Sequence, residues 1–366
     1  MTQGFSIYLN LLRFCAAFLV LVSHFAYPRF TGGRWIWVRD LNLGSDAVIL
    51  FFVLSGFVIA LVADQKKTGV EGFAFDRLTR LISVALPALV LGFVLDRTGA
   101  QISAQTYDNW FYNPLSFTEQ MIRGLTFSNE WSGLATRLGT NGPYWSLSYE
   151  AAFYALFAVA YYLCGLRRIV LLVLGLWIFG LNILLLMPAW IMGVVLYHRL
   201  SRHKGMPRGR ALVCMLMPVL IYGAALWLDV PAKLMALTEP VNQFFGLRFS
   251  DEFVWNGMLG VLVVTHLIGM AALLNDRSFA KVAPLVAWLA GGSFSLYLVH
   301  YPVLQYLSVA LPKVSPPDGN DAILLIITVL VCFAFAQVFE RPLHIWRRGL
   351  RKLTWRLTRK HMQTSI

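Results

Sequence analysis

Charged side chains are scarce in this sequence. Only 13% of its 366 residues are charged, about half of the ~25% that is typical of soluble domains. Acidic residues are the scarcest, with 18 Asp and Glu against 31 Lys and Arg. Apolar runs of 18 to 23 residues are common instead, and a run of that length can cross the ~30 Å hydrocarbon core of a bilayer. This pattern excludes an ordinary soluble protein and indicates a polytopic membrane protein.

Several chemical signatures are also missing. The four cysteines show no CxxC spacing, so the sequence suggests neither a disulfide framework nor a zinc site, and we expect no metal. The sequence lacks GxSxG, HExxH and Walker motifs, which leaves a serine hydrolase, a zincin and a P-loop ATPase without support. The N-terminus has no basic stretch of the kind that begins a cleavable signal peptide. The basic residues fall between apolar runs, so they indicate membrane orientation and no nucleic-acid partner.

Ten apolar segments are candidate membrane spans. The weakest is 188–200, because at 1.5 Å per residue its 13 residues cover only ~20 Å. A hairpin at Met187 and Pro188 would separate it from the fifth span. The predicted spans are 5–27, 44–63, 81–96, 144–164, 169–186, 188–200, 211–228, 253–274, 284–311 and 321–340.

The distribution of basic residues predicts the orientation. With the N-terminus in the cytoplasm, 21 Lys and Arg lie in cytoplasmic segments and 9 lie outside. We therefore predict an all-α polytopic bundle of about ten transmembrane helices with both termini cytoplasmic. Its domains are a transmembrane domain, 1–340, and a basic amphipathic tail, 341–366, which suits an anionic lipid surface. The outside segment 97–143 is expected to pack on the bundle as a cap.

Ionisable residues inside the spans require an explanation, because inserting each one at bilayer depth costs ~3 kcal/mol of free energy. Arg13 and His24 are 11 residues apart in the first span, so they share one helix face, ~16 Å apart along the axis. Such a polar face suits a pore or a long ligand. The alternative is that Arg13 extends its guanidinium group to the membrane surface and that His24 is a hydrogen-bonded structural residue. Asp46 opens the second span, where it can orient His24 through one ring nitrogen or cap the helix.

Two more ionisable residues fall at the same depth. Glu150 in the fourth span and His300 in the ninth lie in the outer half of the membrane in this topology, as do His24 and Asp46. We therefore predict that these four side chains form one polar site. His266 lies in the middle of its span and fits either the core or a site.

A pair of arginines precedes the third span. Arg77 and Arg80 are three residues apart and so face the same way on a helix. Ordinary cytoplasmic charge is the more common explanation of a bare pair, but guanidinium groups also suit phosphate oxygens.

Six motifs in this order resemble the acyltransferase-3 family of integral membrane acyltransferases, over essentially the whole chain. The motifs are RFCAAFLVLVSH (Arg13 to His24), GSDAVILFFVLSGFVI (around Asp46, Ser55 and Gly56), RLTRLISVALP (Arg77 and Arg80), YWSLSYE (Trp145 and Glu150), SFSLYLVHYPV (Tyr297 and His300) and FERPLH (Glu340 and Pro342).

The resemblance implies transfer of an acyl group, usually acetyl, from cytoplasmic acyl-coenzyme A to a hydroxyl of a carbohydrate or other acceptor, often at the outer face. The resemblance thus implies an acyltransferase for groups other than aminoacyl groups, and we expect its membrane to be the bacterial inner membrane. Some relatives carry a fused extracytoplasmic hydrolase-like domain. This chain ends 26 residues after its last predicted span, so we expect such a domain to be a separate protein or unnecessary.

Roles follow for the candidate residues. We predict that Arg77, Arg80 and Arg13 bind the coenzyme, and that His24 is the general base, oriented by Asp46. Base catalysis is typically worth about 10²–10⁴-fold; a covalent acyl-histidine stays open. The predicted catalytic residues are His24, Asp46 and Glu150, and the predicted acceptor-binding residues are Arg13, Trp145, Tyr297 and His300.

A transporter or flippase is the alternative function. Polar residues inside a bundle also mark substrate and proton pathways. Transporters often show internal repeats, and this sequence has no convincing repeat. Consumption of acyl-coenzyme A separates the two functions, because a transporter turns over none.

Overall fold

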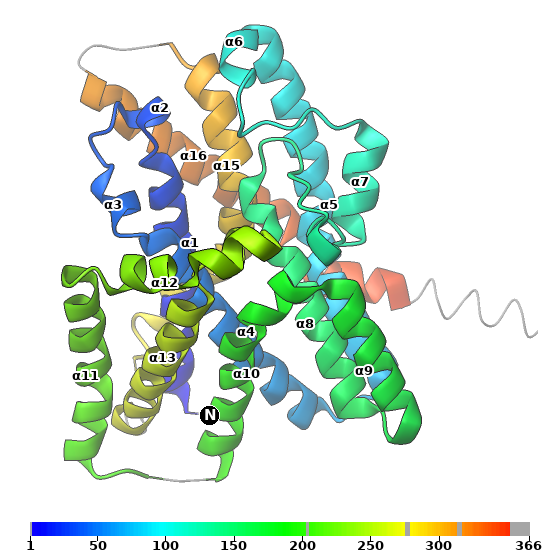
Figure 1. The fold of residues 1–366 in the computed structure, drawn as a ribbon, viewed down its shortest axis with the longest axis vertical. Coiled ribbons are helices and arrows are strands. Elements are labelled where there is room, and N and C mark those ends of the chain that lie inside the picture. The colour runs from blue at the N-terminus through cyan, green and yellow to red at the C-terminus, as the bar shows by residue number, and fades with distance from the viewer. Residues whose placement is uncertain (1, 203–204, 275–278, 313–316, 352–366) are drawn as a thin grey trace, which may run out of the picture.

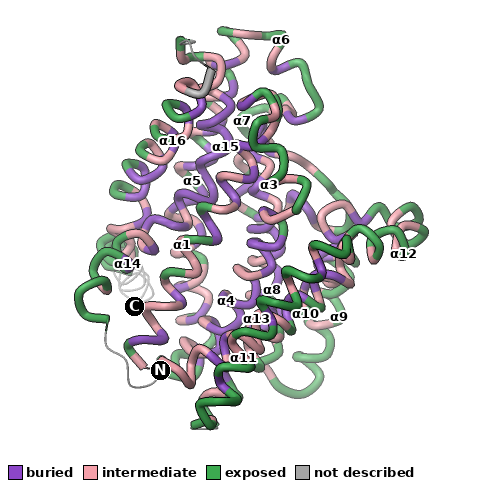
Figure 2. Tube along the Cα trace, turned by 90° about the vertical axis from the view of Figure 1, so that its left-hand side faces the viewer, coloured by how far each residue is buried: buried purple, intermediate pink, exposed green. Residues whose placement is uncertain are grey.

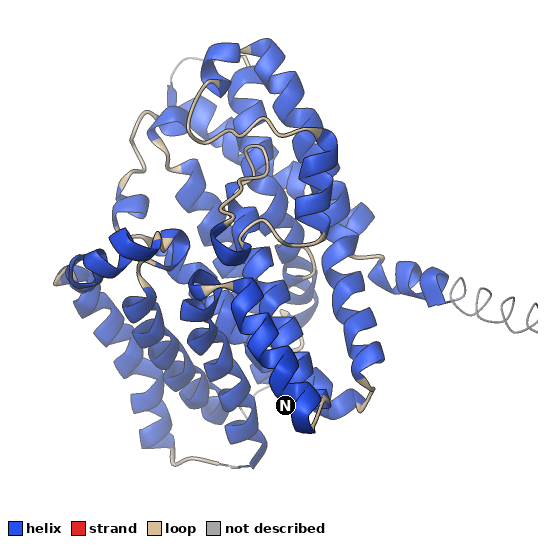
Figure 3. Cartoon of the chain, turned by 45° about the vertical axis from the view of Figure 1, so that its right-hand side comes forward, coloured by secondary structure: helices blue, strands red, loops and turns tan. Residues whose placement is uncertain are grey.

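The computed structural model describes residues 2–202, 205–274, 279–312 and 317–351, and these ranges contain helices and no strands (Figures 1 and 3). The all-α fold predicted from the sequence is confirmed for them. The helices are α1 (Gln3–Phe25), α2 (Pro28–Thr31), α3 (Trp37–Asp40), α4 (Leu43–Lys66), α5 (Val70–Ile102), α6 (Ala104–Tyr107), α7 (Phe117–Leu125), α8 (Trp145–Tyr162), α9 (Gly165–Phe179), α10 (Leu181–Arg202), α11 (Arg208–Trp227), α12 (Val230–Phe245), α13 (Phe253–Leu273), α14 (Ala283–Ala290), α15 (Ser293–Ala310) and α16 (Pro317–Phe339), with 3-10 turns at Trp131–Gly133, Gly142–Tyr144 and Arg248–Ser250.

The described chain contains seven helices that are long and apolar enough to cross a membrane, and eight if α14 and α15, bent by 47°, form one span. The protein is therefore an integral membrane protein. The shorter helices α8 and α9 have 18 and 15 residues and fall where two more spans were predicted. The count of ten spans and the cytoplasmic position of both termini stay predictions. Most of the predicted tail, 352–366, lies outside the described residues.

One predicted boundary is wrong, and one predicted span is part of a longer helix. The break between the fifth and sixth spans falls at Gly180, whose φ of 81° favours glycine, and Pro188 lies inside α10. Neighbouring helices tolerate a proline in a membrane helix, so Pro188 does not start a new one. The predicted third span, 81–96, lies within α5, which begins at Val70 and has 33 residues. It is ~50 Å long, so it reaches beyond the hydrocarbon core.

The core forms around α4, the most buried of the candidate spans. Its Gly56 lies against the backbone carbonyl of Trp190 in α10, and Gly193 of α10 lies against the carbonyl of Val53. Small residues on both sides let the two backbones approach closely, which is a common device between membrane helices. The helices that carry the candidate site therefore sit on a rigid centre.

Replacing Gly56 tests this contact. We expect Gly56→Ala to lower the thermal unfolding temperature in detergent, because a Cβ would overlap the Trp190 carbonyl, and overpacking costs about 1–3 kcal/mol. Gly223→Ala in α11 is the matched control, since a Cβ there meets nothing within 4 Å. Equal unfolding temperatures for the two variants would contradict the close packing of α4 and α10.

Many exposed side chains on the outer helices of the bundle are apolar. Figure 2 shows many exposed residues along α11, in contrast to the buried residues of α15. The exposed side chains of α9 and α11 include Trp177, Val213 and Leu220, which suits contact with lipid. The predicted cap, 97–143, does pack on the bundle: Gln120 of α7 donates to the Leu89 carbonyl of α5 over 3.1 Å. The sequence did not predict α12, which lies across the bundle in Figure 1.

Candidate functional site

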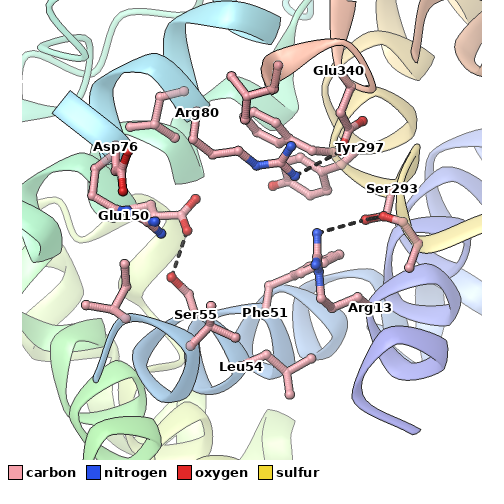
Figure 4. Close-up of a pocket in the computed structure, with 18 of the residues that line it drawn as sticks. Arg13, Phe51, Leu54, Ser55, Asp76, Arg80, Glu150, Ser293, Tyr297 and Glu340 are labelled. Atoms are coloured by element: carbon pink, nitrogen blue, oxygen red, sulfur yellow. Dashed lines mark hydrogen bonds and ion pairs between the residues drawn. The ribbon is translucent and has the colours of Figure 1, made fainter. Parts of the chain in front are cut away.

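A cavity of about 1350 Å³ lies among α1, α4, α5, α8, α14, α15 and the segment after α16. We call it the arginine pocket. Eight Lys and Arg side chains and three carboxylates line it, so cationic groups outnumber anionic groups around the cavity. These residues are Lys66, Arg13, Arg77, Arg80, Arg341, Arg347, Arg348 and Arg351, with Asp76, Glu150 and Glu340. Figure 4 shows Arg13 and Arg80 among the side chains around it.

The two arginines of α5 are held differently. Arg80 forms an ion pair with Glu340 over 2.9 Å, and the other oxygen of Glu340 accepts from the backbone nitrogen of Ser295 over 2.8 Å. This pair ties α5 to α15 and to the end of α16. Arg77 also lines the pocket, but its buried Nε has no hydrogen-bond partner among the described residues. The Nε of Arg341, which also lines the pocket, is in the same state. Arg77 and Arg341 thus each have an N–H left over for a bound anion.

Arg13 and Glu150 lie deeper in the same pocket. The guanidinium of Arg13 donates to Ser293 over 3.4 Å, a weak bond that leaves most of its N–H groups toward the cavity. The carboxylate of Glu150 accepts from Ser55 over 2.7 Å and from Tyr154. Glu150 is therefore held by hydroxyl groups on α4 and α8.

A second cavity, of about 520 Å³, contains His24. We call it the histidine pocket. Residues of α1, α3, α4, α8, α11, α12, α13 and α15 line it. Trp145 and Phe249, stacked 4.5 Å apart, form part of its wall. The two pockets share two lining residues, Val48 and Tyr297, so they adjoin at that point.

Hydrogen bonds fix the tautomers of two histidines. Nδ1 of His300 lies 2.8 Å from the Leu296 carbonyl, which only accepts, so in the neutral ring Nδ1 carries the hydrogen. Its Nε2 then holds a lone pair and accepts from Nδ1 of His24 over 3.0 Å. Nε2 of His24 is left as the basic nitrogen. The chain of bonds therefore presents one histidine lone pair in a pocket that adjoins the arginine pocket.

The expected contact between Asp46 and His24 is corrected. The Asp46 carboxylate accepts from Tyr222 over 2.7 Å and from Trp255 over 2.8 Å, so it joins α4 to α11 and α13. It does not cap α4 either, because Asn42 is the N-cap residue. Within the described chain, His300 takes the place beside His24 that was predicted for Asp46.

The predicted shared site is thus divided. His24 and His300 form a pair, Glu150 lines the arginine pocket, and Asp46 is a buried link between helices. His266 bonds Tyr8 over 2.5 Å and the Met215 carbonyl over 2.8 Å, which accounts for both ring nitrogens as structural contacts.

Comparison with known proteins identifies the family. A sequence profile described as an acyltransferase domain of the acyltransferase-3 type matches residues 6–340. The chain belongs to the acyltransferase-3 family. It is similar to Acyltransferase MdmB from Streptomyces mycarofaciens, with 30% identity over 154 residues. That match covers 41% of this chain and 38% of the relative, so it spans well under half of each. No solved structure matches the chain.

The structure of this acyltransferase-3 member gives the predicted acceptor-binding residue Tyr297 a partner, and it adds residues to which the sequence assigned no role. Tyr297 bonds Ser146 over 2.6 Å where the pockets adjoin, which gives that tyrosine a fixed position. Ser55 was quoted in a motif without a role, and it holds Glu150. Asn256 lines the histidine pocket, and no sequence pattern had marked it.

Proposed function

We propose that this protein is a membrane O-acyltransferase that moves an acetyl group from cytoplasmic acyl-coenzyme A to a hydroxyl of a carbohydrate-type acceptor at the outer face. One observation carries the proposal: a cationic pocket adjoins a pocket with a histidine whose hydrogen bonds leave Nε2 as the basic nitrogen. The predicted topology opens the first to the cytoplasm and the second to the outside. The membrane is then the cytoplasmic membrane of a bacterium.

The arginine pocket suits the coenzyme. Its phosphates carry several negative charges, and guanidinium groups bind phosphate through two parallel N–H bonds. Arg77 has an unused N–H for this purpose, while Arg80 is anchored by Glu340. The pantetheine arm would run past Arg13 toward Tyr297, where the pockets adjoin. This path brings the thioester to the boundary of the histidine pocket.

The histidine pocket suits the acceptor hydroxyl. Nε2 of His24 takes the hydroxyl proton while the oxygen attacks the thioester carbonyl. The carbon–sulfur bond then breaks, and the imidazolium returns the proton to the coenzyme thiolate. His300 accepts from Nδ1–H of His24 throughout and favours the imidazolium that forms. Glu150 lies on the coenzyme side, so we assign it to positioning the donor rather than to proton transfer.

Purified protein tests the function. Incubation with acetyl-coenzyme A and a mixture of sugar acceptors should release free thiol, and thiol release should rise with acceptor concentration. A transporter or flippase would release none. Absence of thiol release from folded protein across all acceptors would contradict the proposed function.

Arg77 tests the donor site. We expect Arg77→Ala to weaken coenzyme binding about 10- to 100-fold, because hydrogen bonds to charged groups contribute about 1.5–3 kcal/mol. Arg77→Lys should recover only part of the affinity, since an ammonium replaces a fork of N–H groups. Binding is measured by titration calorimetry in detergent. Arg199→Ala, on α10 and outside the residues that line the pocket, is the control. Unchanged coenzyme affinity in Arg77→Ala would contradict a role in donor binding and leave this arginine as a positive charge that orients the chain in the membrane.

A further inference from the structure

Carboxylates outnumber guanidinium groups among the residues that line the histidine pocket. Four carboxylates and two guanidinium groups line it, whereas the arginine pocket has the opposite balance. These residues are Asp40, Asp229, Asp251 and Glu252, with Arg39 and Arg248.

Both arginines already have other partners. Arg248 forms an ion pair with Glu130 over 3.2 Å, outside the set of residues that lines the pocket. Arg39 donates to the Ser23 carbonyl over 3.1 Å and lies 3.6 Å from the centre of the Tyr27 ring. Neither arginine forms an ion pair with a carboxylate of the pocket.

The carboxylates have no cation of their own. None of the four has an ion-pair partner within the described ranges. Glu252 accepts only a neutral bond, from Asn42 over 2.6 Å, and Asp251 accepts from the backbone nitrogen of Glu252. Burial raises the pKa of Glu252 to about 7, as expected for a carboxylate that lacks a counter-ion.

An unsatisfied amide lies beside them. Asn256 is one helical turn after Glu252 on α13, lines the same pocket and is 4% exposed. Its Oδ1 has no hydrogen-bond partner among the described residues. A buried acceptor of this kind is costly to leave unpaired, so it calls for an N–H or O–H group from a ligand.

We infer that the histidine pocket takes an acceptor that carries a protonated amine as well as the hydroxyl that is acylated, such as an amino sugar. The ammonium group lies between Glu252 and Asn256, which supply charge and a hydrogen-bond acceptor. The stacked rings of Trp145 and Phe249 provide an apolar wall for the ring of the acceptor. This assignment of the acceptor class rests on the proposed function.

Two matched acceptors test the inference. One is a methyl glycoside with a dimethylamino group, and the other is the same glycoside with a hydroxyl in its place. A tertiary amine forms no stable amide, so only O-acylation is counted, and its protonated form keeps one N–H for Asn256. We expect kcat/KM with acetyl-coenzyme A to be about tenfold higher for the amine, because it gains a charge-assisted hydrogen bond.

Three variants locate the effect. Glu252→Gln and Asn256→Ala should each lower kcat/KM for the amine about tenfold and change it less than threefold for the neutral glycoside. Glu239→Gln on α12, whose carboxylate bonds Asn242 and Gln243 outside the lining of the pocket, is the matched control and should leave both values unchanged. Equal kcat/KM for the two acceptors in the wild type would overturn the inference.

Binding without the donor separates this inference from the proposed function. The amine glycoside should raise the unfolding temperature of the protein in the absence of acetyl-coenzyme A, and Glu252→Gln should remove that shift. A shift that depends on Glu252, with no thiol release from any acceptor, would support the amine site and contradict acyl transfer. Thiol release with no preference for the amine in either assay would support acyl transfer and overturn the amine site.

Discussion

His24→Ala is expected to abolish acyl transfer. The variant lacks the nitrogen that accepts the hydroxyl proton, and base catalysis is typically worth about 10²–10⁴-fold. The rate of thiol release at saturating acceptor should fall by that factor, while coenzyme affinity stays within about twofold, because His24 does not line the arginine pocket. In the wild type the rate should also fall as the pH is lowered, because a protonated imidazole has no lone pair for the hydroxyl proton.

The control for His24→Ala is a check that the variant is folded. Unfolding temperature and coenzyme binding are measured on the same preparation, so that a lost fold is not mistaken for lost chemistry. A His24→Ala protein that acylates its acceptor at a rate near that of the wild type would remove His24 as the base.

His300→Phe is expected to have the second largest effect. Phenylalanine keeps a ring of similar size but removes the nitrogen that accepts from Nδ1–H of His24 over 3.0 Å. The His24 tautomer is then no longer fixed and its imidazolium is not stabilised. Loss of a partner that orients a reacting group typically costs about 10–100-fold, so kcat should fall by about that factor with little change in KM for the coenzyme. His300→Gln should recover part of kcat, because its amide oxygen can accept the same hydrogen.

A double variant separates positioning from structure. If His300 acts through His24, adding His300→Phe to His24→Ala should cause no further loss, because residues that act as a unit are not additive. Multiplied losses in the double variant would show that His300 supports the fold independently and would contradict its role as a positioning residue.

The sequence predicted the helical class, but not the partners of the polar residues. Hydropathy and helical spacing place His24, Asp46, Glu150 and His300 along the membrane normal. Depth is only one coordinate, and the rotation of each helix decides which cavity a side chain reaches. Glu150 was predicted at the same depth as His24, yet it lines the arginine pocket. Asp46 bonds Tyr222 and Trp255 on helices that follow more than 170 residues later in the chain.

Local signals misled in two places. Met187-Pro188 has the composition of a turn, yet tertiary packing keeps Pro188 within α10, and the break falls at Gly180 instead. Asn256 carried no signal at all, because a single amide in an apolar span is common in the core. Only the cavity and its unpaired Oδ1 distinguish it.

The most direct test of the account is transfer across a membrane. Purified protein is reconstituted into lipid vesicles, and only the molecules whose arginine pocket faces the lumen are assayed, with acetyl-coenzyme A trapped inside and the glycoside acceptor outside. Molecules in the other orientation have no access to the donor. Because the two pockets adjoin at Val48 and Tyr297, we predict an acetylated acceptor outside and free coenzyme inside, detected by mass spectrometry, with His24→Ala vesicles forming neither. Acetylated acceptor that forms only when donor and acceptor share one side of the membrane would contradict the account.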